Sequence, residues 1–534
     1  MRRIDRATLG LIAGLALAAG LGLAFWPAGT ALEEDASHYV SSGVNLLSGR
    51  GFVATDGRAE THYPPFYPIL IGLGFRLTGD GETSARVISF LASVLLLIPL
   101  YALVSNVFSK RTAVMTVLLL AMFPLRVFYS HEAMSEALYT FILITASAWF
   151  LRLLQSQHPH PAGMAGVGTL IGLAYLTRPE GLLYLPVFLG FILLRRPGKR
   201  FLVQGAVVVL AFAALALPYV FYLKQTTGKW LVSGKGRTFY DARYFEEAGD
   251  RASWHGALSV VADERGSVRP VTKIGPDAYP PPTLDTWLKR VSRNAFRLLD
   301  ELAKLYFPVG WALIGVGIFS ASTDPSRRWR LLYLLSLSLP LGIVLVTFLE
   351  RRYLLPTAFV FLALIAEGIV RIAERGERLW GPDRRSRVVV LAVSLMAVLF
   401  FREMTQPIRW QAIGPVERKA VGLWMRDHLP PGKVMAVNVT TAFYANMVLE
   451  SFPYGGLRET LEYARGRGTR YVEIAERYRT IHHPEIVRLM DHPGSVQGMR
   501  LVHEDSRPGR PRVWLYVLDP SARAVTVRGE RIRG

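Results

Sequence analysis

Three carboxylates, Glu33, Glu34 and Asp35, follow directly on an apolar run, and Tyr39 comes four residues after Asp35. If this stretch is helical, the side chains of Asp35 and Tyr39 share one face. A positioned carboxylate can take the proton of a hydroxyl and so make its oxygen a better nucleophile. The stretch is therefore either a site for general-base chemistry or a hydrated cap that follows an apolar segment.

Arginines and further carboxylates recur at the ends of other apolar runs. They are Arg126, Arg178, Arg351, Arg352, Glu132, Glu136 and Glu180. Ionisable groups at a membrane boundary are costly, so they usually pair with each other or line a polar cavity. The planar fork of arginine matches the oxygens of a phosphate group. The set is either a collection of structural ion pairs or a cavity suited to moving a sugar from a lipid phosphate.

Apolar runs close to the length of a membrane span must position these residues. Of the 534 residues, 51% are hydrophobic and none is cysteine, so disulfide and thiolate chemistry is excluded. A bilayer core is crossed by about 20 apolar residues, which predicts about eleven spans in a polytopic, mostly α helical bundle. The expected spans are residues 9–26, 86–108, 112–129, 135–154, 164–177, 181–194, 201–223, 298–321, 331–349, 353–372 and 388–401.

Basic residues gather in alternate loops between these spans. The net charge of +21 comes from 62 basic and 41 acidic residues. The basic groups are Arg2, Arg3 and Arg6, then Lys110 and Arg111, then residues 195–200, 327–330 and 371–387. Such a distribution orients membrane proteins with the basic loops in the cytoplasm, so a nucleic-acid partner is not needed to explain it. We expect a cytoplasmic N-terminus, although the first span could instead be a cleaved signal peptide.

The remaining segments fall on the opposite, outer side. We predict a membrane domain over residues 1–401, with outer loops at 27–83 and 224–297, and a small extracytoplasmic α/β domain over 402–534. In the second domain, "GPVERKAVGLWMRDHLP" reads as a helix, and "KVMAVNV" and "RYVEIAE" read as strands. The stretch "MRLVHEDSRPGRPRVWLYVLD" reads as a hairpin across Pro508 and Gly509.

Several stretches together resemble a known family. They are "DASHYVSSGVNLLSGRGF", "HYPPFYPILIGLGFRLTGDGETSARVISFLASV", "FYSHEAMSEALYTFILITA", "GLAYLTRPEGLLYLPV" and "ERRYLLPTAF", in that order. The chain resembles the membrane glycosyltransferases of the GT-C type over about residues 2–371. The nearest likeness is to the branch with dolichyl-phosphate-mannose–protein mannosyltransferases and lipid A aminoarabinose transferases (glycosyltransferase families 39 and 83).

The resemblance implies a polyprenyl-phosphate sugar donor, an active site at the outer membrane face and inversion at the anomeric carbon. It places Asp35 at the catalytic base of the family and Glu136 at a second catalytic acid. Tyr39, His62, Tyr63, Arg86 and Arg178 match positions around the donor. Together with Arg351, Arg352 and Tyr353, they are our candidates for binding the donor or its phosphate.

The sequence departs from its relatives at two of these positions. Ala36 follows the first acid where the protein mannosyltransferases carry Glu, and Tyr63 precedes the Pro-Pro pair where the aminoarabinose transferases carry Lys. No cofactor is required by the sequence. Glu34, Asp35 and Glu132 supply hard oxygen ligands for a divalent metal, but their spacing is not that of a known metal motif.

The expected function is transfer of a sugar to a hydroxyl of a glycolipid, a glycan or a protein. The enzyme would span the inner, cytoplasmic membrane many times and work among its lipids. The alternative is a polytopic transporter or flippase of lipid-linked sugars or other solutes. Transporter sites tend to lie near the midplane of the bilayer, on broken helices of internal repeats. Here the candidate residues instead gather at one membrane surface.

Overall fold

The structure is a computed structural model of the chain. It describes residues 5–27, 29–235, 260–262, 268–270, 284–347, 349–412, 415–453, 456–480, 482–494 and 498–519. The chain forms two compact units. The first, here called the membrane unit, comprises residues 1–27, 61–234 and 282–409, and the second, the sheet unit, comprises 28–60, 235–281 and 410–534.

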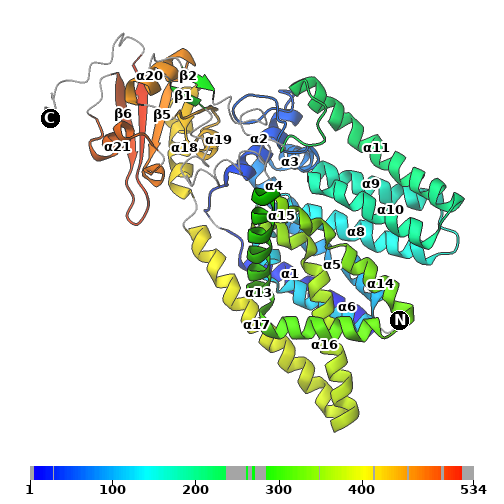
Figure 1. Cartoon of the computed structure of the whole chain (residues 1–534). Helices are drawn as coiled ribbons and strands as arrows, with labels where there is room; N and C mark the ends of the chain where they lie inside the picture. The colour runs from blue at the N-terminus through cyan, green and yellow to red at the C-terminus, as the bar shows by residue number, and fades with distance from the viewer. Residues whose placement is uncertain are drawn as a thin grey trace. The chain divides into compact units, whose positions relative to one another are not determined.

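Helices make up the membrane unit (Figure 1). They are α1 (Arg6–Ala24), α3 (Phe66–Thr78), α4 (Gly81–Leu95), α5 (Leu97–Val107), α6 (Lys110–Ala121), α7 (Pro124–Tyr129), α8 (Glu136–Gln155), α9 (Pro161–Thr177), η1 (Pro179–Leu183), α10 (Tyr184–Arg195), α11 (Lys199–Thr227), α13 (Leu284–Ser322), α14 (Pro325–Ser336), η4 (Leu339–Gly342), α15 (Ile343–Val346), η5 (Arg351–Leu354), α16 (Leu355–Trp380) and most of α17 (Pro382–Ala412).

Seven helices in the described residues are long and apolar enough to cross a membrane. They begin at Arg6, Gly81, Glu136, Lys199, Trp287, Pro325 and Arg351, and each coincides with an expected span. The other four expected spans are also helical, at α6–α7, α9, α10 and α17. Proline and glycine interrupt several of these, because proline cannot continue the hydrogen bonds of a helix. The chain is thus a multi-pass membrane protein with the mostly α architecture that was expected.

Helix α16 forms the interior of the membrane unit. It packs against α13, α6 and α8, and most of its apolar length is buried. Gly368 of α16 and Gly317 of α13 mark the closest approach, because a Cβ on either would lie within 2.3 Å of a carbonyl oxygen of the other helix. Small residues at such points let helix backbones meet closely in membranes. The α13–α16 contact therefore depends on these two glycines.

The sheet unit is built on a mixed, five-stranded sheet with the order β4-β3-β5-β7-β6. Its elements are α2 (Glu34–Leu47), α18 (Val416–His428), β3 (Lys433–Ala436), α19 (Val439–Tyr444), β4 (Val448–Ser451), α20 (Leu457–Gly466), β5 (Tyr471–Ala475), η6 (Glu476–Tyr478), α21 (Pro484–Asp491), β6 (Met499–Asp505) and β7 (Val513–Leu518). A separate short pair joins β1 (Val260–Ala262) and β2 (Val268–Pro270).

Alternating side chains of the sheet fill two cores. Val472 and Trp514 point into the core under α20 and α21, whereas Val434 and Leu515 point into the core under α18 and α19. The helix predicted before Pro430 is confirmed as α18, the two predicted strands as β3 and β5, and the predicted hairpin as β6–β7. The C-terminal residues therefore fold as a small α/β sheet with helices on both faces.

Part of the predicted first outer loop contributes to the sheet unit. Residues 28–60, including α2, group with residues 410–534. The Leu449 amide on edge strand β4 donates to the Thr55 carbonyl oxygen at 3.2 Å, so this segment extends the hydrogen bonding of the sheet. The domain division at residue 401 stays a prediction, and most of the predicted outer loop at 224–297 lies outside the described residues.

Candidate functional site

The carboxylate of Glu136 is the centre of a charged cluster in the membrane unit. Glu136 is the first residue of α8, and its side chain is fully buried. Arg178, which ends α9, donates from Nη1 to Oε1 of Glu136 at 2.5 Å. Arg352 in η5 brings its Nε to 4.0 Å from the same oxygen. The other carboxylate oxygen, Oε2, is buried and has no hydrogen-bond partner among the described residues.

Two further acids and an aromatic ring orient the arginines. The Tyr353 ring centroid lies 5.3 Å from Cζ of Arg178 and 5.5 Å from Cζ of Arg352. Glu180 lies 3.5 Å from Nη2 of Arg178, and Glu350 lies 2.5 Å from Nε of Arg352. These six residues are the Glu136 cluster. Guanidinium groups held by ion pairs and a ring are suited to binding a phosphate.

Arg86 and Arg351 pair with other acids. Arg86 is buried on α4, where it bonds to Glu82 at 3.0 Å and to the His131 carbonyl oxygen at 2.9 Å. Arg351 is exposed, and its Nε lies 2.7 Å from Glu301 on α13. Successive side chains of the short helix η5 point in different directions, which explains why Arg351 and Arg352 have different partners. Their phosphate-binding roles stay predictions.

His62 and Tyr63 lie just before α3. Their rings meet edge to face with centroids 4.6 Å apart, and Tyr63 is buried. The preceding Thr61 carbonyl oxygen accepts a hydrogen bond from the Tyr219 hydroxyl of α11 at 3.4 Å. This contact fixes the backbone beside the two rings, while their predicted contact with the donor remains untested.

Asp35 and Tyr39 lie in the sheet unit, not in the membrane unit. Asp35 is half-buried in the first turn of α2, and Tyr39 is buried one turn later, as the spacing predicted. Glu34 accepts a hydrogen bond from the Asn438 side-chain amide at 3.0 Å. That Asp35 works in one cavity with the Glu136 cluster stays a prediction.

The three predicted metal ligands are divided between the units. Glu34 and Asp35 belong to the sheet unit, whereas Glu132 belongs to the membrane unit. Across the part of the chain that the structure describes, no group of three or more His, Asp or Glu residues could hold a metal ion.

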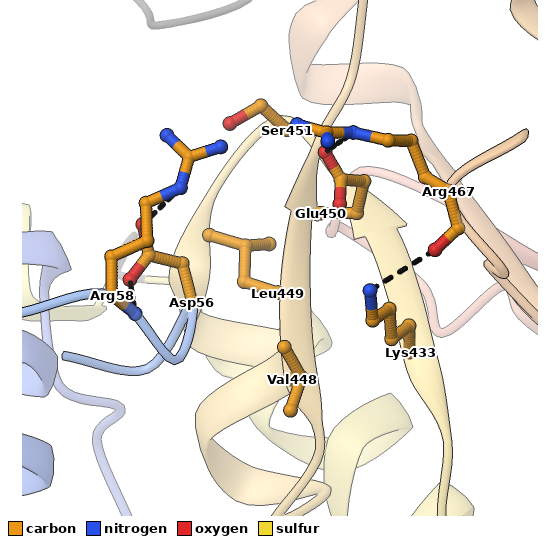
Figure 2. Close-up of a pocket in the computed structure, with 8 residues that line it drawn as sticks. All are labelled: Asp56, Arg58, Lys433, Val448, Leu449, Glu450, Ser451 and Arg467. Carbon is orange, nitrogen blue, oxygen red and sulfur yellow. Dashed lines mark hydrogen bonds and ion pairs between the residues drawn. The ribbon is translucent and has the colours of Figure 1, made fainter. Parts of the chain in front are cut away.

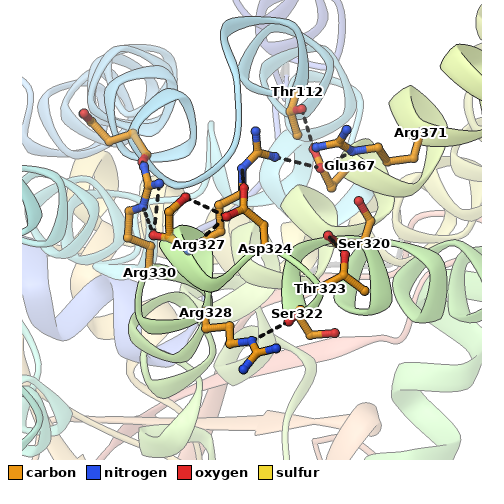
Figure 3. Close-up of polar contacts among 12 residues, drawn as sticks. Thr112, Ser320, Ser322, Thr323, Asp324, Arg327, Arg328, Arg330, Glu367 and Arg371 are labelled. Atoms are coloured by element: carbon orange, nitrogen blue, oxygen red, sulfur yellow. Dashed lines mark hydrogen bonds and ion pairs between the residues drawn. The ribbon is translucent and has the colours of Figure 1, made fainter.

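A second buried carboxylate of the membrane unit was missed in the sequence. Glu367 of α16 is 1% exposed and accepts a hydrogen bond from the Thr112 hydroxyl at 2.7 Å (Figure 3). Arg371 donates to its other oxygen at 2.7 Å, and Arg327 lies 3.6 Å from that oxygen. We call these four residues the Glu367 cluster. The signal was an acid inside the apolar run "ALIAEGIV", because acids within spans are rare and usually have a partner.

Arg126 provides a third buried polar contact in this unit. It is 1% exposed on α7 and donates from Nη2 to the Ala18 carbonyl oxygen of α1 at 2.8 Å. The bond ties α7 to α1, so this arginine has a structural contact of its own.

Glu473 is a buried acid of the sheet unit. It lies on β5, on the side of the sheet covered by α18 and α19, and is 2% exposed. Burial raises the pKa of its carboxyl from 4.5 to about 7, although Arg418 and a hydrogen bond with Thr441 oppose the shift. Sequence reasoning missed this residue because it occurs in an ordinary strand pattern.

A small pocket opens beside edge strand β4 in the sheet unit (Figure 2). Its volume is about 140 Å³, and it is lined by Asp56, Arg58, Lys433, Val448, Leu449, Glu450, Ser451 and Arg467. The charges already have partners, such as Glu450 with Arg467 at 3.4 Å. Pockets for small ligands usually measure about 300–1,000 Å³, so we do not assign the candidate site here.

Part of this chain is similar in sequence to a known protein family. The sequence family described as dolichyl-phosphate-mannose-protein mannosyltransferase matches residues 62–222. No sequence among curated proteins matches.

Solved structures match over almost the whole chain. The oligosaccharyltransferase of Archaeoglobus fulgidus has a TM-score of 0.60 at 14% identity, covering 93% of this chain and 73% of its own. ArnT from Cupriavidus metallidurans, bound to undecaprenyl phosphate, has a TM-score of 0.60 at 13% identity, covering 95% and 97%. The mycobacterial arabinofuranosyltransferase AftD has a TM-score of 0.54 at 14% identity, covering 96% and 40%.

These similarities agree with the resemblance found in the sequence. At such low identity the solved structures establish the fold alone, and the family match runs from just before α3 into α11. The resemblance to GT-C glycosyltransferases is confirmed, and the chain has the fold of these membrane enzymes.

Proposed function

We propose that the protein transfers a sugar from a polyprenyl phosphate to an acceptor hydroxyl at the outer face of the cytoplasmic membrane. The observation that carries this proposal is the Glu136 cluster, in which Arg178 and Arg352 converge on one buried oxygen. Two of the similar structures are described with undecaprenyl phosphate and with dolichol-phosphate. Paired arginines suit the phosphate that such donors have in common.

In this mechanism, Asp35 is the general base. The acceptor oxygen attacks the anomeric carbon as its proton passes to Asp35, and the bond from that carbon to the phosphate oxygen breaks. The electron pair of the broken bond leaves with the polyprenyl phosphate, and the configuration at the sugar inverts. General-base help of this kind contributes roughly 10²–10⁴-fold to a rate.

The arginines stabilise the leaving group. Charge grows on the phosphate as the bond breaks, and fixed cations nearby lower the barrier most when they need no rearrangement. Glu136 and Glu350 orient Arg178 and Arg352, respectively. Because the phosphate leaves without being protonated, one base and two cations suffice, unlike the two carboxylates of a typical glycosidase.

The proposal specifies the chemical class of the partners. The donor is a polyprenyl-phosphate-linked sugar, hexosyl or pentosyl, and the acceptor is a hydroxyl of a glycolipid, a glycan or a protein. Neutralisation of the phosphate falls to the arginines. Glu34 and Asp35 could bind a divalent cation that assists the arginines. Activity that survives EDTA would show that no exchangeable metal takes part.

The test replaces Asp35 by Asn in the full chain and measures transfer from a radiolabelled polyprenyl-phosphate sugar in membrane vesicles. We expect a rate loss of at least about 10²-fold with unchanged protein yield. The matched control is Glu33→Gln, which removes a neighbouring exposed carboxylate and should keep the rate. Near-normal transfer by the Asp35→Asn protein would reject Asp35 as the base.

A further inference from the structure

We propose that Tyr444, Thr440 and Asn438 of the sheet unit are positioning residues that hold the start of α2 and so fix Asp35. The inference rests on the proposed function, in which Asp35 is the base. It assigns to the C-terminal residues an indirect part in catalysis, through the backbone before Asp35 and not through contact with the substrate. All the contacts that support it lie within the sheet unit.

The backbone of Leu32 is held from both sides by α19. Its amide donates to the Tyr444 hydroxyl at 2.9 Å, and its carbonyl oxygen accepts from the Thr440 hydroxyl at 3.3 Å. Leu32 and Thr440 are both fully buried. A backbone held at its donor and its acceptor by two side chains of one helix cannot shift without breaking a buried hydrogen bond.

Asn438 extends this grip to the residue before Asp35. Its Nδ2 donates to Glu34 at 3.0 Å, while its Oδ1 accepts from the amide and the hydroxyl of Thr440 at 3.0 and 2.7 Å. Asn438 is also the N-cap of α19. Because Oδ1 must face the amide of Thr440, the NH₂ group can only face Glu34, which settles the orientation of the side-chain amide.

Helix α18 adds a contact at the other end of the segment. Lys419 donates to the Thr30 carbonyl oxygen at 2.8 Å, and its ammonium lies 4.8 Å from the ring centroid of Tyr444. Helices α18 and α19 therefore hold residues 30–34 together. More than 380 residues of the chain separate this segment from the two helices.

The beginning of α2 depends on these contacts. The helix begins directly after this segment, where the Glu33 carbonyl oxygen accepts the Ser37 amide at 2.9 Å. Asp35 follows Glu34 directly, and each helical residue advances about 1.5 Å. A small movement of Leu32 or Glu34 thus moves the Asp35 carboxylate by a similar amount. Misplacement by about 1 Å can cost roughly 10²-fold in rate.

The test compares two tyrosines that each lose one hydroxyl. Tyr444→Phe, alone and with Asn438→Ala, removes bonds to Leu32 and Glu34. The control is Tyr471→Phe, whose buried hydroxyl bonds to the Pro430 carbonyl oxygen at 2.7 Å, away from residues 30–34. We expect the double variant to lose about tenfold or more in kcat with an unchanged KM for the donor. Tyr471→Phe should leave both constants as they are.

A second measurement follows position directly. The chain has no cysteine, so a single Glu33→Cys substitution allows a spin label to be placed next to the segment. We expect the label to become more mobile in the Tyr444→Phe/Asn438→Ala background and to stay unchanged with Tyr471→Phe. The mobility measurement needs no activity.

The two readouts separate the possible failures. Loss of kcat together with raised mobility supports the inference. Wild-type kcat, or unchanged mobility, in the double variant overturns it, even if Asp35→Asn is inactive. Full activity of Asp35→Asn rejects the proposed base, and the mobility result then still decides whether α19 holds the segment.

Discussion

Two buried glutamates of the membrane unit have similar partners but different hydrogen bonding. Glu367 has one oxygen bonded to Thr112 and the other to Arg371, with Arg327 nearby. Both arginines of Glu136 lie at the same oxygen, Oε1: Arg178 donates a hydrogen bond to it, and Nε of Arg352 lies 4.0 Å from it. The other oxygen, Oε2, has no hydrogen-bond partner among the described residues. Buried polar atoms are nearly always satisfied, and exceptions call for an explanation.

We propose that the difference separates a structural cluster from a functional one. The Glu367 cluster joins α6, α14 and α16, and both oxygens of its carboxylate accept a hydrogen bond. The Glu136 cluster keeps an incompletely satisfied acid between two arginines, an arrangement that can change when a phosphate arrives. Each of the two glutamates thus has two arginines nearby, and the hydrogen bonding of its oxygens distinguishes the two proposed roles.

The largest expected effect is on Glu136. We expect Glu136→Gln to lower the transfer rate by about 10²–10³-fold, because Arg178 loses the carboxylate that holds it toward the leaving phosphate. Because Arg178 is buried as well, the apparent Tm in detergent should also fall, so the rates are compared per folded molecule. The same assay on Glu367→Gln provides the contrast, with a rate per folded molecule near that of the wild type. Equal losses of rate in both variants would contradict the distinction.

The next effect concerns the stability of the Glu367 cluster. We expect Glu367→Gln to lower the free energy of unfolding by about 2–3 kcal/mol, since the buried carboxylate loses its charge-assisted hydrogen bonds to Thr112 and Arg371. A lower apparent Tm in detergent would show this. The control Glu374→Gln removes an acid that contacts Arg371 at the exposed edge of the same region, and we expect a much smaller change. An unshifted Tm for Glu367→Gln would refute the structural role.

The sequence predicted the elements well but not these clusters. All eleven expected spans are largely helical, and seven of them are long and apolar enough to cross a membrane, because an apolar run is a local property of the sequence. The strands around Val434, Val472 and Trp514 also followed from local alternation. Contacts between residues hundreds of positions apart were not accessible, such as Leu32 with Tyr444 or Thr112 with Glu367. Periodicity shows which face of an element is buried, but not which other element covers it.

The sheet unit also has a buried glutamate, Glu473. Its raised pKa predicts that the stability of this unit depends on pH. Its carboxyl keeps a proton up to about pH 7 when folded, whereas in the unfolded chain it ionises near 4.5. Folding therefore becomes less favourable as the pH rises from about 4.5 to about 7, and the penalty is constant above that. A difference of this size is worth up to about 3 kcal/mol.

Replacing this acid removes the penalty. We expect Glu473→Gln to raise the apparent Tm at pH 8, where the wild-type protein pays the cost of the buried carboxyl. At pH 4.5 the Tm should be nearly unchanged, because the carboxyl of the folded wild-type protein is already protonated and neutral, like the amide that replaces it. The control is Glu504→Gln, on an exposed part of β6, with no such dependence on pH. A gain of the same size at both pH values would show that the proton on Glu473 is not its cause.

The smallest effect tests one hydrogen bond of the Glu367 cluster. Thr112→Val keeps the shape of the side chain but removes the hydroxyl that donates to Glu367 at 2.7 Å. A hydrogen bond to a buried charge within a helical membrane bundle is worth about 1–2 kcal/mol, so the apparent Tm should fall by a few degrees. The matched control is Thr116→Val, one turn later on α6, whose buried hydroxyl bonds only to the Thr112 carbonyl oxygen of its own helix. That substitution should cost little, because the carbonyl oxygen keeps its place in the helix. If both valines lowered the Tm equally, the loss would come from helix α6 itself and not from the carboxylate of Glu367.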